Sequence, residues 1–379
     1  MPGMPLPRRR DWVNSVVNLY GFTARTLRPV IDLPPGRITL INTSKCNLRC
    51  RYCRVRSGLN RQRDNELTGP EWDTVLSGIP RTTIVAMTGG EPFADPNIDP
   101  ILDCLLGRRV PVSIVSNGTL LDEQRIEHLV GHGLPYLMLS LQGTAAYHDR
   151  AQGVPGTFDT VLAAIDSIRR TKERLNAKRP VLCVKSIVFP DNTEELRKLV
   201  DLMEENGAIE HMSFSFEVGR SLQHSYRVVS DTGEWDAAVS LFEYPPDARN
   251  RVMEFVRWVC RAARSSRLQL GFDLRPARAG DLVDYVRDPR HFEVPRCRVP
   301  WNEFSLYYDG QISSCISHDL GNIRELDYDV RKVLRSAKYR AFLKQLRKNQ
   351  PHVAPCMSCN VAPVRRKMRS IGSRRPPAQ

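Results

Sequence analysis

From Arg37 to about residue 275, the chain alternates short β-rich runs with longer amphipathic stretches of helical period. The β-rich runs are apolar over most of their length, as strands buried in a parallel sheet are. This alternation predicts parallel strands joined by right-handed helical crossovers, and six such units make a complete or partial α/β barrel. The expected strands are 38–42, 83–87, 110–115, 136–141, 181–189 and 211–216, with another at 268–272, and the expected helices are 71–77, 122–130, 158–174, 193–206 and 252–267.

The length of 379 residues favours two domains, at roughly 150 residues per domain. The alternation stops near residue 275, and short β-like pieces (303–308 and 311–315) and a basic helix (330–348) follow. We therefore divide the chain into an N-terminal extension (1–36), a core barrel (37–275), a smaller cysteine-bearing domain (276–360) and a basic tail (361–379). In α/β barrels, functional residues lie on the loops at the carboxyl ends of the strands.

The formal net charge is +14. Part of the excess lies in the terminal segments, and no zinc-finger, homeodomain or RNP-type signature accompanies it, so we expect solvated tails and no specific nucleic-acid partner. No apolar run approaches the roughly 18 residues that cross a bilayer, which predicts no membrane span. The first residues lack the apolar core of a signal peptide, so the expected location is the cytoplasm.

Seven of the ten cysteines fall in two groups, and in the reducing cytosol such clusters more often bind metal than form disulfides. Cys46, Cys50 and Cys53 follow the first expected strand with the spacing C-x3-C-x2-C. Three thiolates can hold three irons of a [4Fe–4S] cluster and leave one iron open for chemistry. The alternative is a structural zinc site, whose fourth ligand would be His128, His132 or a distant cysteine.

This motif, with Tyr52 before its third cysteine, resembles that of the radical S-adenosylmethionine (radical SAM) superfamily. Three further segments at strand ends strengthen the resemblance. Gln142 departs from it, since that branch of the family usually has Asp there. The segments are Thr88-Gly89-Gly90-Glu91-Pro92, Ser116-Asn117-Gly118-Thr119 and Ser140-Leu141-Gln142-Gly143.

The resemblance implies that the open iron chelates S-adenosylmethionine (SAM) and that one electron cleaves it to a 5′-deoxyadenosyl radical. A flavodoxin- or ferredoxin-like protein would donate that electron. The segment formed by Gly89, Gly90, Glu91 and Pro92 would receive the methionyl amino group, with its glycines permitting close backbone approach. Tyr52 would lie near the adenine. Ser116, Asn117 and Ser140 would contact the ribose or the carboxylate, or else shape the turns.

A second cysteine group resembles the SPASM and twitch domains of the same superfamily. Cys297 and Cys315 flank a hairpin expected at Gly310, and the pair Cys356 and Cys359 follows. Four thiolates fill one auxiliary [4Fe–4S] cluster, or one structural zinc site as the alternative. The fold class that we expect is thus a partial (β/α)6 TIM-like barrel with a small C-terminal twitch (SPASM-like) domain.

Three residues are candidates for the substrate site. Lys185 and Cys183 share one face of the fifth expected strand, so Lys185 would contact the substrate or act as a base if that face lines the barrel. Cys183 would then be the hydrogen donor that a radical epimerase needs, or a small apolar core residue. Glu217 follows the sixth strand and is a further candidate for the pocket.

These features predict a radical SAM oxidoreductase that dehydrogenates a small natural-product or carbohydrate-like substrate, with the auxiliary cluster accepting an electron. The alternatives are radical epimerisation of such a substrate and modification of a ribosomal peptide. A more distant alternative is a zinc-stabilised protein that binds nucleic acid.

Overall fold

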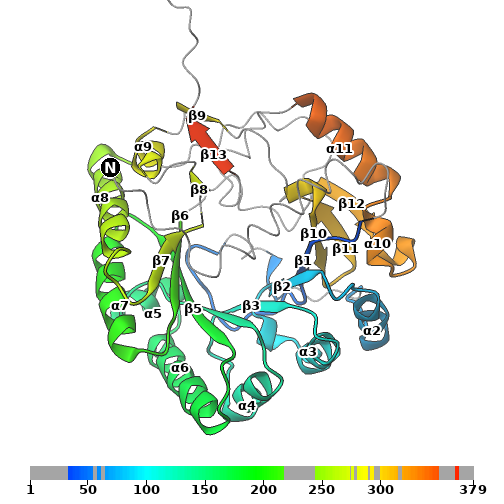
Figure 1. The fold of residues 1–379 in the computed structure, drawn as a ribbon, viewed down its shortest axis with the longest axis horizontal. Coiled ribbons are helices and arrows are strands. Elements are labelled where there is room, and N and C mark those ends of the chain that lie inside the picture. Colours follow the sequence, from blue (N-terminus) through cyan, green and yellow to red (C-terminus); the bar gives the residue numbers. More distant parts are fainter. Residues whose placement is uncertain are drawn as a thin grey trace, which may run out of the picture.

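The computed structural model describes most of the chain, and Figure 1 shows a strongly curved sheet with helices along its outer side. The described residues are 33–53, 58–60, 65–216, 244–273, 275–276, 280–288, 291–293, 299–314, 318–349 and 363–366.

The large sheet has ten strands in the order β12-β11-β10-β1-β2-β3-β4-β5-β6-β7. All neighbours from β10 through β1 to β7 are parallel, and the two pairs at the β12 end are antiparallel. The expected six strands are therefore confirmed, and the further strand at the C-terminal end of the barrel adds a seventh parallel unit. The strands are β1 (Arg37–Ile41), β2 (Ile84–Thr88), β3 (Val112–Ser116), β4 (Tyr136–Ser140), β5 (Val181–Val188), β6 (His211–Phe216), β7 (Gln269–Phe272), β10 (Glu303–Tyr307), β11 (Gln311–Ser314) and β12 (His318–Asn322).

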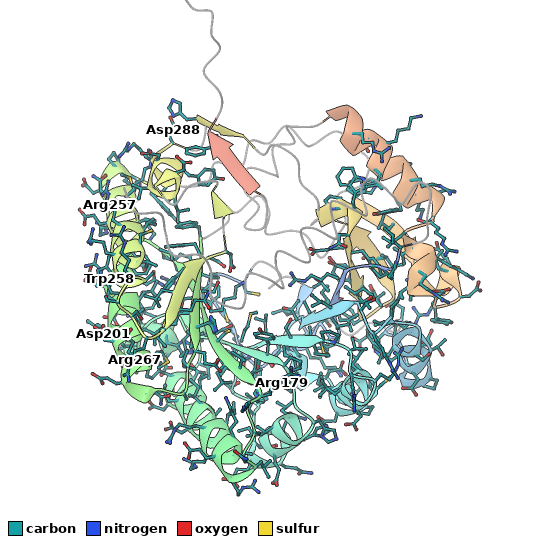
Figure 2. All side chains as sticks on the ribbon, viewed as in Figure 1. Arg179, Asp201, Arg257, Trp258, Arg267 and Asp288 are labelled. Carbon is teal, nitrogen blue, oxygen red and sulfur yellow. The ribbon has the colours of Figure 1, made fainter. Side chains whose placement is uncertain are left out.

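The helices that connect these strands pack on one face of the sheet (Figure 1). Figure 2 shows Arg257 and Trp258 of α8 on the outer side of this layer. The basic helix expected at 330–348 is two helices, α10 (Val330–Val333) and α11 (Ala337–Asn349). No helix in the described residues is both long and apolar enough to span a membrane. The others are α2 (Gly69–Ser77), α3 (Ile98–Gly107), α4 (Glu123–Gly131), α5 (Ala145–Gln152), α6 (Thr157–Arg174), α7 (Thr193–Asn206), α8 (Pro246–Ala262) and α9 (Asp281–Arg287), with short turns η2 (Pro92–Ala94), η6 (Val299–Trp301) and η7 (Ile323–Leu326) and a second sheet of β8 (Arg275–Pro276), β13 (Pro363–Arg366) and β9 (Phe292–Glu293).

Alternation along the strands separates two faces of the sheet. On the helix-facing side, Leu137 and Leu139 of β4 and Leu182 and Val184 of β5 are fully buried, and they form the core with the helices. Several residues of the opposite, concave face keep partial exposure, among them Ser140 and Lys185. We call the space on this concave side the lumen. The sequence pattern therefore leaves one face of a largely apolar sheet open for binding.

The C-terminal segment continues the barrel sheet, because β10 pairs in parallel with β1. A tight hairpin joins β10 to β11, and Gly310 adopts φ +81° in it, a backbone conformation that favours glycine. The hairpin expected at Gly310 is therefore confirmed. The division between residues 275 and 276 remains a prediction. Near it the chain passes from β7 of the large sheet to β8 of the second sheet, and it returns to the large sheet at β10.

An ion-pair cluster ties this C-terminal segment to the first barrel helix. Glu71 forms a capping box with Thr68 at the start of α2. Its carboxylate also accepts hydrogen bonds from Arg324, at 2.6 and 3.1 Å, and from Tyr328, at 2.8 Å. The hydrogen bonds from Arg324 are the main reason that the pKa of Glu71 falls from 4.5 to about 2. Glu71 therefore links two regions that are more than 250 residues apart.

Replacing Glu71 by Gln is expected to lower the melting temperature by about 2–4 °C at pH 7. The folded-state pKa lies below the unfolded value, so the stabilisation is present above pH 4.5 and is lost as the pH falls through about 2. The difference between the two melting temperatures, measured by circular dichroism from pH 7 downward, should shrink accordingly. Asp73→Asn, which alters an exposed carboxylate of the same helix, is the control; an equal effect there would contradict the assignment.

Candidate active site

The three clustered cysteines lie on the loop that leaves the carboxyl end of β1, and all three are partly buried. Asn60 fixes the first of them, since its side-chain amide accepts from the backbone N–H of Cys46 at 2.8 Å and donates to the Cys46 carbonyl at 2.9 Å. Asn60 itself adopts φ +54° and donates its own N–H to the Ser44 carbonyl. These hydrogen bonds from Asn60 fix the backbone of the loop at the first cysteine of the motif.

The C-terminal end of α5 fixes the second cysteine. The side chain of Gln152 accepts a hydrogen bond from the Cys50 thiol, and its carbonyl accepts from the backbone N–H of Arg49 at 3.0 Å. Gly153 ends the helix so close to the loop that a Cβ there would lie 2.9 Å from the Arg49 carbonyl oxygen. The helix end and the cysteine loop are thus packed backbone to backbone.

Arg51, between the second and third cysteines, anchors the same loop to the end of β5. Its guanidinium donates to Asp191 at 2.9 Å and to Tyr147, and it lies over the rings of Tyr147 and Phe189. Tyr52 packs its ring 5.7 Å from that of Phe189. The aromatic residue of the motif therefore stabilises the loop by packing; its expected contact with adenine remains a prediction.

The thiols of the loop resist ionisation when no metal is present. Burial, followed by the neighbouring Cys46 and Cys53, raises the pKa of Cys50 to about 12, and burial also raises that of Cys46. A bound metal would supply the missing positive charge, so its binding would release protons from these thiols. This coupling makes the loop a site that a metal centre completes.

The three cysteine sulfurs do not form a compact triad of the kind that one zinc ion needs. Zinc, with Zn–S bonds of about 2.3 Å, would hold its sulfur ligands about 3.8 Å apart. Among the described residues, the one triad of ligand-type side chains whose ligand atoms all lie within 4.8 Å of one another is Asp103, His128 and His132. The two histidines that could have completed a zinc site at the cysteines therefore lie beside Asp103 instead.

The turn after β2 is pressed onto the start of the cysteine loop. A Cβ on Gly90 would lie 2.1 Å from the Lys45 carbonyl oxygen, and one on Gly89 would lie 2.7 Å from that of Thr43. The N–H groups of Gly90 and Glu91 donate to Thr43 and Lys45 at 2.9 and 2.7 Å. The glycines therefore allow the backbone at the start of the cysteine loop to pack directly against this turn.

Glu91 connects this turn to the end of β3 from a buried position. Its carboxylate accepts from the Ser116 hydroxyl and from the Asn117 N–H, both at 2.7 Å, and burial raises its pKa. Ser116 lies on the helix-facing side, beside Leu139, and its hydroxyl also accepts from Gly118. Ser116 thus shapes the turn, the alternative role that its position allowed. Pro92 starts the short turn η2.

Asn117 links the end of β3 to the cysteine loop. Its side-chain amide donates to the carbonyl oxygen of the Asn47 side chain at 3.0 Å, and Asn47 donates in turn to the Thr119 hydroxyl at 2.7 Å. Asn47 belongs to the segment between the first two cysteines. Strand ends from β1, β2 and β3 are therefore hydrogen-bonded into one platform around the motif.

Gln142, which departs from the family pattern, forms hydrogen bonds within the barrel at the end of β4. Its side-chain oxygen accepts from the N–H of Ile187 at 2.7 Å, and its own N–H donates to Nδ1 of His148 at 3.1 Å. Burial lowers the pKa of His148 to about 4, so the ring is neutral at pH 7. The amide oxygen of Gln142 thus links the end of β4 to β5.

A polar group faces the lumen at the carboxyl ends of β5 to β7. Nζ of Lys185 lies 2.8 Å from Oδ2 of Asp273. The Asp273 carboxylate also accepts hydrogen bonds from the hydroxyls of Ser213, at Oδ1, and Ser215, at Oδ2. Burial opposes ionisation of Asp273, but the Lys185 charge and the hydroxyls outweigh it and lower the pKa. Ser140 is the neighbour of Lys185 on β4. The expected role of Lys185 at the substrate and that of Ser140 at the cofactor remain predictions. The sequence analysis missed Asp273, although its place after a strand was a usable signal.

The remaining candidates have different outcomes. Cys183 is buried, one lumen-facing layer below Lys185, level with Met138 and His211. Its role as hydrogen donor remains a prediction. The other candidates lie outside the described residues: Glu217 and the auxiliary-cluster cysteines Cys297, Cys315, Cys356 and Cys359.

The residues around the motif fit an iron–sulfur cluster with a chelating ligand. The Ser44 hydroxyl is buried at the entry to the cysteine loop and makes no hydrogen bond, and Oδ1 of Asn42 is buried and unpaired as well. Unsatisfied buried polar atoms are costly, and they concentrate where a ligand completes the structure. Together with the three thiols of the loop, these unpaired polar atoms fit a site that a cofactor completes.

Comparison with known families agrees with this geometry. A model of the radical SAM superfamily matches residues 40–203, which contain the three cysteines and strands β2 to β5. A model of an iron–sulfur cluster-binding domain, SPASM, matches residues 297–360, which begin at Cys297 and include the other three C-terminal cysteines.

Several named proteins are similar to this chain, each over a different length. An AdoMet-dependent heme synthase of Methanosarcina barkeri is 30% identical over 182 residues, 47% of this chain, and the match spans half of that protein. The sporulation killing factor maturation protein SkfB of Bacillus subtilis is 23% identical over 330 residues, 83% of this chain and 72% of SkfB. The crystal structure of Streptococcus suis SuiB bound to its precursor peptide SuiA covers 95% of this chain and 78% of SuiB, with a TM-score of 0.62 at 15% identity, and this shows a shared fold.

Proposed function

Because this chain is a radical SAM enzyme with a C-terminal SPASM-type iron–sulfur domain, we propose that it modifies a peptide by removing hydrogen from it. A [4Fe–4S] cluster and SAM, when bound, supply reductive cleavage and a radical that abstracts a hydrogen atom. Cys46, Cys50 and Cys53 would hold that cluster. The four C-terminal cysteines would hold one auxiliary cluster, which would supply an acceptor for the electron that the substrate gives up when it also loses a proton.

The protein's own residues have three tasks in this reaction. Asn60 and Gln152 position the cysteine loop through its backbone and the Cys50 thiol. The glycine turn locks β2 onto the same loop. The lumen-facing group around Lys185 then orients the substrate at the same edge of the sheet, since β5 to β7 end on the side where β1 and β2 end.

One observation carries the choice of a peptide: Lys185 and Asp273 form a neutral pair with hydroxyl donors beside it. Such a pair offers both donors and acceptors to an uncharged polar group such as an amide. A heme-type tetrapyrrole carries propionate carboxylates, which require cations that are not already neutralised. In the described part of the lumen, the charge of Lys185 is already matched by Asp273.

The relatives include enzymes of both kinds and do not decide between a peptide and a tetrapyrrole. The match to the peptide-maturation protein SkfB extends over most of both chains, and so does the match to an AdoMet-dependent heme synthase of Nitratidesulfovibrio vulgaris, which covers 84% of this chain and 82% of that protein. The small natural-product alcohol favoured by the sequence has no support among these relatives. Oxidation remains part of the proposal, with a peptide as its substrate.

The test is product analysis with enzyme reconstituted without oxygen. We expect about eight irons per chain, with matching sulfide, and formation of 5′-deoxyadenosine from SAM and a reductant. Short peptides encoded beside the gene should lose two hydrogen atoms each, as measured by mass spectrometry. Turnover of a tetrapyrrole or a sugar, with every such peptide unchanged, would overturn the choice of substrate, and zinc without sulfide would overturn the enzyme itself.

A further inference from the structure

A second cluster of ligand-type side chains lies on the outer helices, apart from the cysteine loop. Asp103 comes from α3, His128 from α4, and His132 from the residue that caps α4. Their ligand atoms all lie within 4.8 Å of one another. The two histidines are four residues apart, so one helical turn places both on the same face.

The hydrogen bonds of this cluster leave the ring nitrogens aimed at the carboxylate. Nδ1 of His132 lies 3.0 Å from the His128 carbonyl oxygen, to which it can only donate. In the neutral ring, Nε2 of His132 is then a lone-pair acceptor, and it faces Oδ1 of Asp103 at 4.0 Å. Two acceptors that face each other repel unless a positive charge lies between them.

His128 presents the same situation at shorter range. Its Nε2 lies 2.8 Å from Oδ1 of Asp103, yet this buried nitrogen makes no hydrogen bond, so the two atoms approach without the required alignment. The two imidazole rings lie side by side, with centroids 4.3 Å apart. Two imidazole nitrogens and one carboxylate oxygen therefore lie within 4.8 Å of one another.

We propose that Asp103, His128 and His132 bind a divalent zinc ion, with water as the fourth ligand. Zinc favours tetrahedral sites built from imidazole and carboxylate, and the backbone bond to Nδ1 of His132 is the outer contact that orients a zinc-bound histidine. Asp103 and His132 are about half exposed, and His132 also lines a cavity at the amino-terminal ends of β2 to β4, so an ion can enter.

The ion would join α3 to α4 beside an existing link of the same kind. Arg125 of α4 already donates to Asp99 of α3 at 3.4 Å, one turn before Asp103 and His128. These helices follow the strands whose ends carry Glu91 and Asn117. Zinc would therefore stabilise the half of the barrel that supports the glycine turn, while taking no part in the reaction.

The experiment measures zinc in the reconstituted enzyme after incubation with zinc sulfate and dialysis. We expect one zinc per chain beyond any held by the cysteines, and a higher melting temperature with zinc than without it. His128→Gln, His132→Gln and Asp103→Asn should each lower the zinc affinity by more than about 100-fold. Loss of an outer contact alone costs about 10–100-fold, and loss of a direct ligand should cost more. Iron content should be unchanged, which shows that each variant is folded.

His291→Gln is the matched control, since His291 is an exposed histidine 3.4 Å from the carboxylate of Asp288 and belongs to no ligand triad among the described residues. It should keep the wild-type zinc content. Equal zinc in wild type and in the double variant His128→Gln/His132→Gln would overturn the proposal. So would zinc that is lost from every protein on dialysis.

Discussion

Replacing Gly90 by Ala is expected to reduce reductive cleavage of SAM by at least about 100-fold. The new Cβ would lie 2.1 Å from the Lys45 carbonyl oxygen and 2.7 Å from its carbon, and both are backbone atoms that no rotamer change can move. The segment before Cys46 must therefore shift. A displacement of about 1 Å costs about that factor when reacting groups are held in place by geometry.

The measurement is 5′-deoxyadenosine formation together with iron content. Iron of the first cluster should fall as well, because Gly90 packs against the residues that lead into Cys46, while circular dichroism should show a folded protein. Gly107→Ala is the matched control: Gly107 ends α3, and a Cβ there meets nothing within 4 Å. Full iron and normal SAM cleavage in Gly90→Ala would show that the loop can move without consequence.

Replacing Lys185 by Met is expected to lower peptide modification by about 100-fold or more and to leave SAM cleavage intact. The side chain keeps its length and loses its charge, so Asp273 is left in a largely buried position without its cation. Removing one partner of a buried, hydrogen-bonded charge pair costs about 2–5 kcal/mol. Since about 1.4 kcal/mol corresponds to a tenfold change in rate, this range includes the expected 100-fold loss of peptide modification.

Uncoupling is the signature that separates a substrate contact from damage to the fold. In Lys185→Met, 5′-deoxyadenosine should still form while the modified peptide does not. Lys198→Met is the control, since Lys198 pairs with Glu195 at 2.7 Å on the surface of α7. That variant should behave as wild type. Peptide modification at the normal rate in Lys185→Met would remove this residue from the substrate site.

The sequence predicts the barrel well because each strand carries its own signal. β-rich runs between amphipathic helices specify parallel strands locally, and β6 and α7 have the expected bounds. The pairing of β10 with β1 has no such signal. It joins residues about 265 positions apart, and no local pattern records which remote strand will cover an exposed edge.

The site shows the same division. Cysteine spacing predicts the motif loop, and strand alternation places Lys185 in the lumen. Asn60 and Gln152, which hold the loop, lie 14 and 102 residues from the cysteines they contact, and both are ordinary polar residues in sequence. The register of Ser116 beside Leu139 directs its side chain toward the helices, and its expected contact with the cofactor remains a prediction.

The strand that precedes the cysteine motif is an interior strand only because β10 covers it. Without residues 303–307, the backbone of Arg37–Ile41 would present unpaired N–H and C=O groups along one side. The cysteine loop would then leave from the exposed border of a sheet, where strands fray and pair with other molecules. The last quarter of the chain thus has a structural role in addition to any electron transfer: it keeps the cysteine loop anchored to an interior strand of the sheet.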